Sequence, residues 1–228
     1  MRGFRCPTLT ASRGYIVRAV SRTRRIVCGW FALCLVTPAA AQARCKPPTG
    51  KVLAHTAQVV VYTHKVRVDG GPQTDGFACR IATGATKAFI DPSRLLAQYD
   101  VEVPRATAAI GGLFAGAVVN IATGSRGGAE IVMIDLRPKH PKVSFDGAPS
   151  RQAGGVVRSL VVSDSGKVAW IVDVSPGFKK KRYEVAKSVG KNKLRVLDRS
   201  GKISPRSLRL SGSTLSWVDA GHSRTSTL

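Results

Sequence analysis

Two segments near the C-terminal end of the chain repeat one another, and this repeat restricts the fold more than any other feature of the sequence. The residues Arg-Ser-Leu-Val-Val-Ser at 158–163 recur as Arg-Ser-Leu-Arg-Leu-Ser at 206–211, an offset of 48 residues. After a short turn, the tripeptide that ends at Trp170 recurs as the tripeptide that ends at Trp217. We interpret the copies as equivalent structural units, with a chance likeness between two hairpins as the alternative.

The differences between the two copies indicate β-strands. Alternate positions keep their apolar character, whereas Val161 between them becomes Arg209 in the second copy. This period of two is typical of a strand with one buried face and one face that tolerates water. The residues predicted to form the structural core of the repeat are Leu160, Trp170, Leu208 and Trp217.

The rest of the chain after residue 43 consists mainly of strand-like segments separated by turn residues. Two alternating segments, 183–189 and 194–197, lie between the copies, so each unit would contain about four strands. Fainter copies at 59–90 and 110–136 extend the pattern upstream. The predicted units are approximately 44–100, 105–150, 155–203 and 204–228, and the last unit lacks one strand.

Two segments depart from the strand pattern. Residues 91–97 begin with Asp-Pro and predict a short helix, because aspartate caps a helix and proline suits its first turn. Residues 138–149 contain prolines and predict an irregular connection. Aspartates beside or two residues before a glycine, among them Asp75 and Asp164, are predicted to occupy turns.

The turn after the first copy carries a resemblance to a known family. Residues 163–170, Ser-Asp-Ser-Gly-Lys-Val-Ala-Trp, resemble the Ser-Pro-Asp-Gly-x-x-Ile-Ala-Phe turn and strand of TolB-type and WD-repeat-like β-propeller blades. The proline is absent, and the acid and the small residue are exchanged. The resemblance covers residues 156–228 best and the upstream units weakly. It implies an all-β, β-propeller-like array of about four four-stranded blades, complete or open, but no activity. A β-sandwich is the alternative fold.

The first 43 residues have the three parts of a secretory signal peptide. Seven arginines and no acid precede an uncharged apolar run at 26–37, and Ala41-Gln42-Ala43 follows it. An uncleaved membrane anchor is the alternative, but crossing a bilayer takes about 20 apolar residues and this run is shorter. We therefore expect residues 1–43 to be removed, by either the general or the twin-arginine export route. A single β-repeat domain, 44–228, would remain.

Export determines the charge and the cysteine chemistry of the mature chain. Removal of the seven arginines would leave 29 basic and 13 acidic residues, a net charge of +16 in place of +23. Cys45 and Cys79 would be the cysteines that remain, and two cysteines in an exported chain predict a disulfide. Two free thiols are the alternative. The expected location is secreted or extracytoplasmic, at the cell surface, without an integral membrane segment after cleavage.

A run of basic residues precedes the strand at 183–189 and defines a candidate site for polyanions. Its position after Ser-Pro-Gly at 175–177 places it at a hairpin tip. An anionic surface would be attracted to such a cluster, and nucleic acid is the least expected partner because the patch lacks interleaved aromatics. A solvated edge that discourages sheet-to-sheet pairing is the alternative. The candidate residues are Lys179, Lys180, Lys181, Arg182, Lys191 and Lys193.

No motif with diagnostic catalytic spacing is found, and no cofactor, metal or catalytic residue is predicted. Nucleophile elbow, phosphate-binding loop and His-Glu-x-x-His patterns are absent from the sequence. We therefore expect an exported, non-enzymatic binding or interaction module for an unknown protein or cell-envelope ligand. A secreted hydrolase on the same scaffold and a charge-driven binder of cell-surface polyanions are the alternatives.

Overall fold

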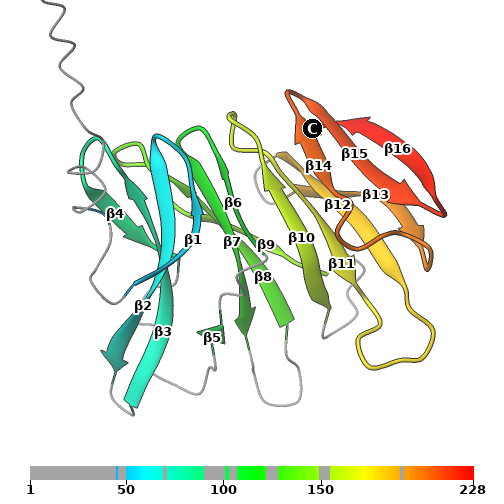
Figure 1. Cartoon of the computed structure of the whole chain (residues 1–228), viewed down its shortest axis with the longest axis horizontal. Helices are drawn as coiled ribbons and strands as arrows, with labels where there is room; N and C mark the ends of the chain where they lie inside the picture. Colours follow the sequence, from blue (N-terminus) through cyan, green and yellow to red (C-terminus); the bar gives the residue numbers. More distant parts are fainter. Residues whose placement is uncertain are drawn as a thin grey trace, which may run out of the picture. The chain divides into compact units, whose positions relative to one another are not determined.

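The computed structural model describes residues 45, 50–68, 71–89, 101–102, 107–121, 128–148, 155–190 and 193–228. In these residues the protein is all-β, with the strands in four antiparallel sheets that follow one another along the chain (Figure 1). Over this part of the chain, no helix is both long and apolar enough to span a bilayer. The predicted helix at 91–97 and the predicted signal peptide at 1–43 lie outside the described residues.

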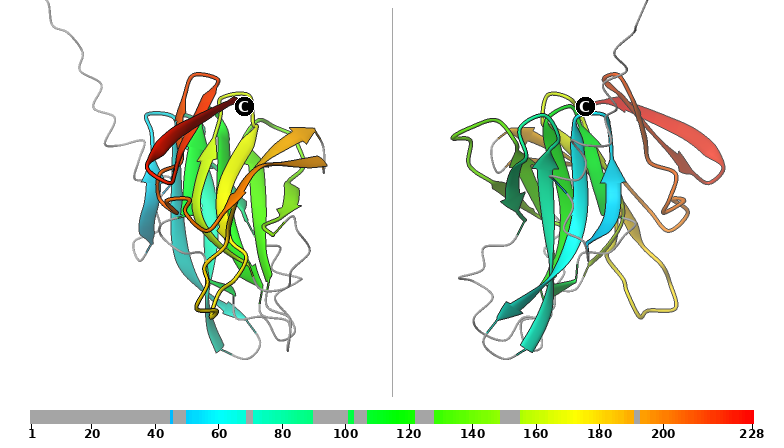
Figure 2. Two further views of the ribbon diagram at one scale, coloured as in Figure 1. Left: turned by 90° about the vertical axis from the view of Figure 1, so that its right-hand side faces the viewer. Right: turned by 60° about the vertical axis from the view of Figure 1, so that its left-hand side comes forward.

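Each sheet is a meander in which strands that are neighbours in sequence pair with one another (Figures 1 and 2). The first sheet contains β1 (Lys51–His55), β2 (Val59–Val68), β3 (Gly71–Arg80) and β4 (Ala85–Ala88). The second contains β6 (Ala108–Gly111), β7 (Phe114–Ile121), β8 (Gly128–Asp135) and β9 (Val143–Asp146), and β5 (Val101–Glu102) also pairs with β7. The third contains β10 (Val156–Val162), β11 (Val168–Asp173), β12 (Tyr183–Gly190) and β13 (Lys193–Ser200). The fourth contains β14 (Arg209–Ser211), β15 (Thr214–Asp219) and β16 (His222–Thr227).

The turn that carries the family resemblance joins β10 to β11. It is closed by hydrogen bonds from Gly166 N to Ser163 O at 2.9 Å and from Ser163 N to Lys167 O at 2.9 Å. Gly166 has a φ of 77°, a conformation that favours glycine. A Cβ at this position would also lie 2.6 Å from a ring atom of Phe114, which belongs to the second sheet. Gly166 therefore allows both the positive φ of the turn and the close approach of Phe114 from the preceding sheet.

Consecutive sheets pack face to face through three apolar clusters. Val59, Val61 and Ala78 of the first sheet pack with alternate residues of β7 and β8. The opposite face of the second sheet, with Ile131 and Met133, packs against the third sheet. The third and fourth sheets share the cluster that contains Ile171, Val185, Leu215 and Trp217. The second and third sheets are thus covered on both faces, which explains their nearly continuous apolar strands such as β11.

The strands β1, β6, β10 and β14, here called the first strands because each begins the meander of its sheet, also lie side by side. β1 contacts β6, β6 contacts β10, and β10 contacts β14. The first strands are therefore close neighbours of one another, while the face-to-face clusters join the bodies of the sheets.

The two tryptophans of the repeat occupy corresponding places. Trp170 lies in the second strand of the third sheet, opposite Leu160, and is fully buried. Trp217 lies in the second strand of the fourth sheet and is 5% exposed. Each packs in the cluster shared with the preceding sheet.

The indole N–H groups correspond as well. Trp170 Nε1 donates to Gly147 O at 2.9 Å, directly after the fourth strand of the second sheet. Trp217 Nε1 donates to Asp198 Oδ2 at 2.7 Å, on the fourth strand of the third sheet. Each tryptophan therefore ties its own sheet to the outer part of the sheet before it.

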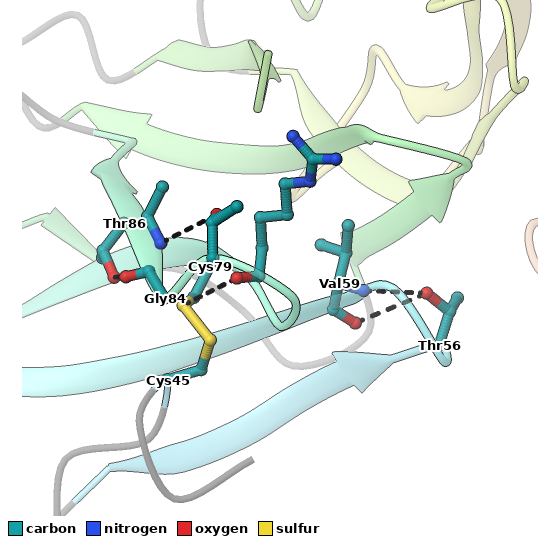
Figure 3. Close-up of a disulfide and its surroundings, with 9 residues drawn as sticks. Cys45, Thr56, Val59, Cys79, Gly84 and Thr86 are labelled. Atoms are coloured by element: carbon teal, nitrogen blue, oxygen red, sulfur yellow. Dashed lines mark hydrogen bonds between the residues drawn. A yellow bond between two sulfur atoms is a disulfide. The ribbon is translucent and has the colours of Figure 1, made fainter. Parts of the chain in front are cut away.

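Cys45 and Cys79 form a disulfide, as predicted, with an S–S distance of 2.10 Å (Figure 3). Cys79 lies on β3 and both cysteines are buried, in a cluster with Val60, Tyr62 and Ile81. The bond joins residues 34 apart in sequence. It covers the face of the first sheet that points away from the second sheet.

Two sequence predictions were wrong in detail. The segment 138–149, predicted as an irregular connection, contains β9, which pairs with β8 through residues that include Phe145. Phe145 is buried against Trp170, so packing outweighs the flanking prolines. Asp75, predicted to occupy a turn, lies within β3 and is 1% exposed. Its carboxylate accepts a hydrogen bond from Gly76 N at 2.6 Å.

Candidate functional site: a basic hairpin

Residues 174–182, here called the basic hairpin, connect β11 to β12 and extend beyond the ends of these strands (Figure 1). Its turn consists of Ser175, Pro176, Gly177 and Phe178, closed by a hydrogen bond from Phe178 N to Ser175 O at 3.1 Å. Proline at the second position and a glycine with φ of 85° at the third are the residues that a type II turn requires. The local sequence therefore fixes the tip of the hairpin.

The base of the basic hairpin is held by a network around Asp173, the last residue of β11. Asp173 Oδ1 accepts from Ser175 N at 3.0 Å, and Ser175 Oγ accepts from Arg182 N at 2.7 Å. Val174 N donates to Arg182 O at 2.9 Å and closes the loop. The segment between β11 and β12 is thus bonded at its base as well as at its tip.

Asp173 is a buried charge with cationic partners. Its side chain is fully buried, and its Oδ2 lies 3.0 Å from Arg158 Nη2 and 3.8 Å from Lys181 Nζ. Burial acts to raise the pKa of Asp173, but the hydrogen bonds from Arg158 and Ser175 and the charge of Lys181 outweigh it, so the pKa is lowered. Asp173 is therefore ionised in the folded protein at neutral pH and anchors the positively charged loop.

The cations of the basic hairpin face solvent. Lys179, Lys180, Lys181 and Arg182 are all exposed. Lys180, Lys181 and Arg182 line a depression of about 990 Å³, together with Phe178 and Arg199 of β13. Arg199 Nε also donates to the buried Glu184 Oε1 at 2.9 Å. Two of the cations that border the depression, Lys181 and Arg199, thus pair with the buried carboxylates of Asp173 and Glu184.

The structure brings four of the six predicted polyanion-binding residues together. Lys193 begins β13 and pairs with Gly190 at the end of β12 that is remote from the basic hairpin. At roughly 3.3 Å per residue, the length of β12 separates Lys193 from the hairpin by about 20 Å or more. Lys191 lies outside the described residues. Arg199, in contrast, pairs with Glu184 near the start of β12 and joins the site.

Sequence reasoning missed Phe178. Its side chain is 70% exposed, and among the described residues the other large exposed apolar side chain is Val189 at 52%. The signal was present in the sequence, because an aromatic residue directly follows Pro-Gly and directly precedes four cations. A phenylalanine in a turn of this kind has no strand face on which to be buried.

A second groove, of about 430 Å³, lies between the second and third sheets and is lined by Asp135, His140 and Ser188. His140 Nδ1 is 3.3 Å from Asp135 Oδ2, and Arg137 also donates to this carboxylate. Burial acts to raise the pKa of Asp135, but the hydrogen bonds from Arg137 prevail and lower it. Ser188 Oγ accepts from Val168 N at 3.0 Å, and no hydrogen bond joins it to His140. An Asp-His pair is present, but within the described part of the chain no serine, threonine or cysteine side chain is hydrogen-bonded to it.

The comparisons with known proteins do not show a family. No protein-family model matches the chain, and no curated protein matches it. The solved structure of the AtxE2 isopeptidase S527A variant with Astexin3-dC4 bound is similar over 78% of this chain, at 10% identity and a TM-score of 0.37. This chain covers 31% of that structure's chain.

Proposed function

We propose that the protein is an exported, non-enzymatic binding module that attaches to an anionic component of the cell envelope through the basic hairpin. The observation that carries the proposal is the exposure of four consecutive cations on a loop held at its base by the buried Asp173. A solvated edge needs charge but no fixed geometry, whereas a binding surface gains affinity when its charged groups are already positioned.

We also propose that the scaffold is an open, β-propeller-like array of blades. The meander order of each sheet, the face-to-face packing and the contacts between successive first strands support this architecture. The corresponding placement of Trp170 and Trp217 supports equivalence of the last two units. The disulfide between Cys45 and Cys79 supports an extracytoplasmic location.

The experiment measures binding to a soluble polyanion such as heparin as a function of salt concentration. We expect affinity to fall steeply with salt, because binding cations to a polyanion releases counterions. The variant K179A/K180A should bind about tenfold or more weakly and with a shallower salt dependence. These lysines are chosen because Asp173 is held by Lys181 and Arg158 instead.

The matched control is K51A/K142A, which removes the same charge from two exposed positions, one on β1 and one directly before β9. Equal losses in the two double variants would mean that net charge alone drives binding and that the basic hairpin is not the site. A hydrolase remains the second candidate function, supported by the Asp135–His140 pair in its groove. Hydrolysis that H140A abolishes would favour it over the binding module.

A further inference from the structure

We propose that the anionic component is a phospholipid bilayer and that Phe178 inserts into its interface while the neighbouring cations bind lipid phosphates. This inference rests on the proposed function and names the partner of the same site. It starts from one contrast: Phe178 is 70% exposed, whereas among the described large apolar residues the other exposed one is Val189, at 52% and near the far end of β12.

The exposure of Phe178 is built into the loop. The hydrogen bond from Phe178 N to Ser175 O closes the turn, and the positive φ of Gly177 is the conformation that this turn needs at its third position. Together they fix the backbone at the tip. The space around Gly177 is open, because no atom beyond its two chain neighbours lies within 4 Å of a Cβ placed there, and Phe178 beside it is 70% exposed. Phe178 is therefore held outward by a hydrogen-bonded loop and presents its ring to solvent.

The charges around Phe178 suit an anionic bilayer. Lys179, Lys180, Lys181 and Arg182 follow it directly, and Arg199 lies across the depression that Phe178 borders. An aromatic side chain beside several cations matches the bilayer interface, where rings lie at the level of the headgroups and cations meet lipid phosphates. Each cation near an anionic membrane surface raises affinity by about fivefold. A soluble polyanion would use the cations but would offer no apolar layer for the ring.

The exposed phenylalanine also argues against single-stranded nucleic acid. Such sites interleave cations with several aromatic rings on which successive bases stack. Among the described large apolar side chains, Phe178 is the one exposed aromatic. One ring at the tip of a loop is suited to insertion.

The test uses the protein purified as cells produce it and vesicles of phosphatidylcholine with or without about 30% phosphatidylglycerol, followed by cosedimentation. We expect binding to the anionic vesicles above that to neutral ones. F178S should weaken anionic-vesicle binding about tenfold and leave heparin binding unchanged, since it removes only the apolar contact. K179A/K180A should weaken both. The matched control is V189S, which changes the other exposed apolar residue and should weaken neither.

A second measurement places a reporter at the tip. In F178W the indole should show a blue-shifted emission and quenching by brominated lipid on anionic vesicles, whereas V189W should show neither. With residues 1–43 and hence Trp30 removed, the other tryptophans are Trp170 and Trp217, which are buried and provide a constant background.

The outcomes separate the two proposals. Heparin binding that depends on Lys179 and Lys180, together with vesicle binding that F178S does not change, would overturn insertion and leave the proposed function standing. Heparin binding without preference for anionic vesicles would do the same. If K179A/K180A weakened neither interaction, both proposals would fall.

Discussion

A single substitution between the two copies of the repeat reflects the position of each sheet in the array. Val161 points toward the fourth sheet and packs in the cluster that the third and fourth sheets share. Arg209 holds the same place in the fourth sheet and is exposed, with Nη1 donating to Leu208 O at 2.7 Å. In the same way, the buried Ala169 becomes Ser216, which is half-buried. The third sheet has apolar residues at these two positions because the fourth sheet covers them. The fourth sheet has polar residues there because none of the described strands covers its outward face.

The two tryptophans should therefore contribute differently to the free energy of unfolding, although they occupy corresponding places in their sheets. W170A should lower the free energy of unfolding by about 3–5 kcal/mol, because it opens a cavity between two sheets and leaves Gly147 O without its indole donor. W217A should cost less, since its sheet is covered on one face. R209V, at an exposed position, should stay within about 0.5 kcal/mol of the parent. Denaturant unfolding of the three variants measures these differences, and equal losses for W170A and R209V would contradict the burial argument.

Asp173 gives the protein an acid-sensitive contact. Its pKa is lowered in the folded state below the ordinary value of 3.8, so the folded state favours the ionised form. The resulting stabilisation is fully present above that ordinary value and is lost as the pH falls through the lower, folded pKa. We expect the thermal midpoint to fall on acidification in this range, and D173N to reduce that fall while lowering the midpoint at neutral pH.

The control for D173N is D164N, which removes a carboxylate from the exposed turn between β10 and β11. It should leave the midpoint at neutral pH close to that of the parent. A D173N protein with an unchanged midpoint would mean that the Asp173 network contributes nothing to stability.

At the scale of elements, the sequence predicted strands well where period-two alternation or a continuous apolar run is bounded by turn residues. β10, β11 and β12 follow this rule because the side chains on their two faces pack against the neighbouring sheets. β9 could not be predicted, because four residues between prolines carry too little pattern and it is Phe145 packing on Trp170 that secures them. β1 was missed for a similar reason: the half-buried residues in its middle give a weak alternation.

The candidate site was predictable in its charge but only partly in its geometry. The run 179–182 after Ser-Pro-Gly predicts a basic hairpin tip from local residues alone. The role of Asp173 could not be predicted, because it depends on Arg158 from a different strand reaching the same carboxylate. Including Lys193 in the patch overlooked the length of β12, since a residue beyond the far end of a strand cannot lie beside its start.

At the scale of the whole molecule, the packing of the sheets predicts an order of local stability. The second and third sheets are covered on both faces, whereas the fourth has three strands and an outward face of polar residues such as Ser216 and Thr225. The first sheet has the disulfide on its outward side. In the loop-entropy account, a disulfide that closes a loop of this length contributes roughly 3–4 kcal/mol, which offsets the lack of a neighbouring sheet on that side.

Hydrogen exchange measured by mass spectrometry should follow this order. Amides exchange through local openings, and those with few buried apolar contacts around them open at the lowest free energy. We expect the slowest exchange in β8 and β11 and the fastest strand exchange in β16, whose residues are mostly exposed.

The variant D198A tests the same order by removing the acceptor of the Trp217 indole, which loosens the fourth sheet from the third. It should speed exchange in β14, β15 and β16 and leave β7 and β8 unchanged. Acceleration spread evenly over all four sheets would mean that the array unfolds as one cooperative unit, contrary to the order predicted from its packing.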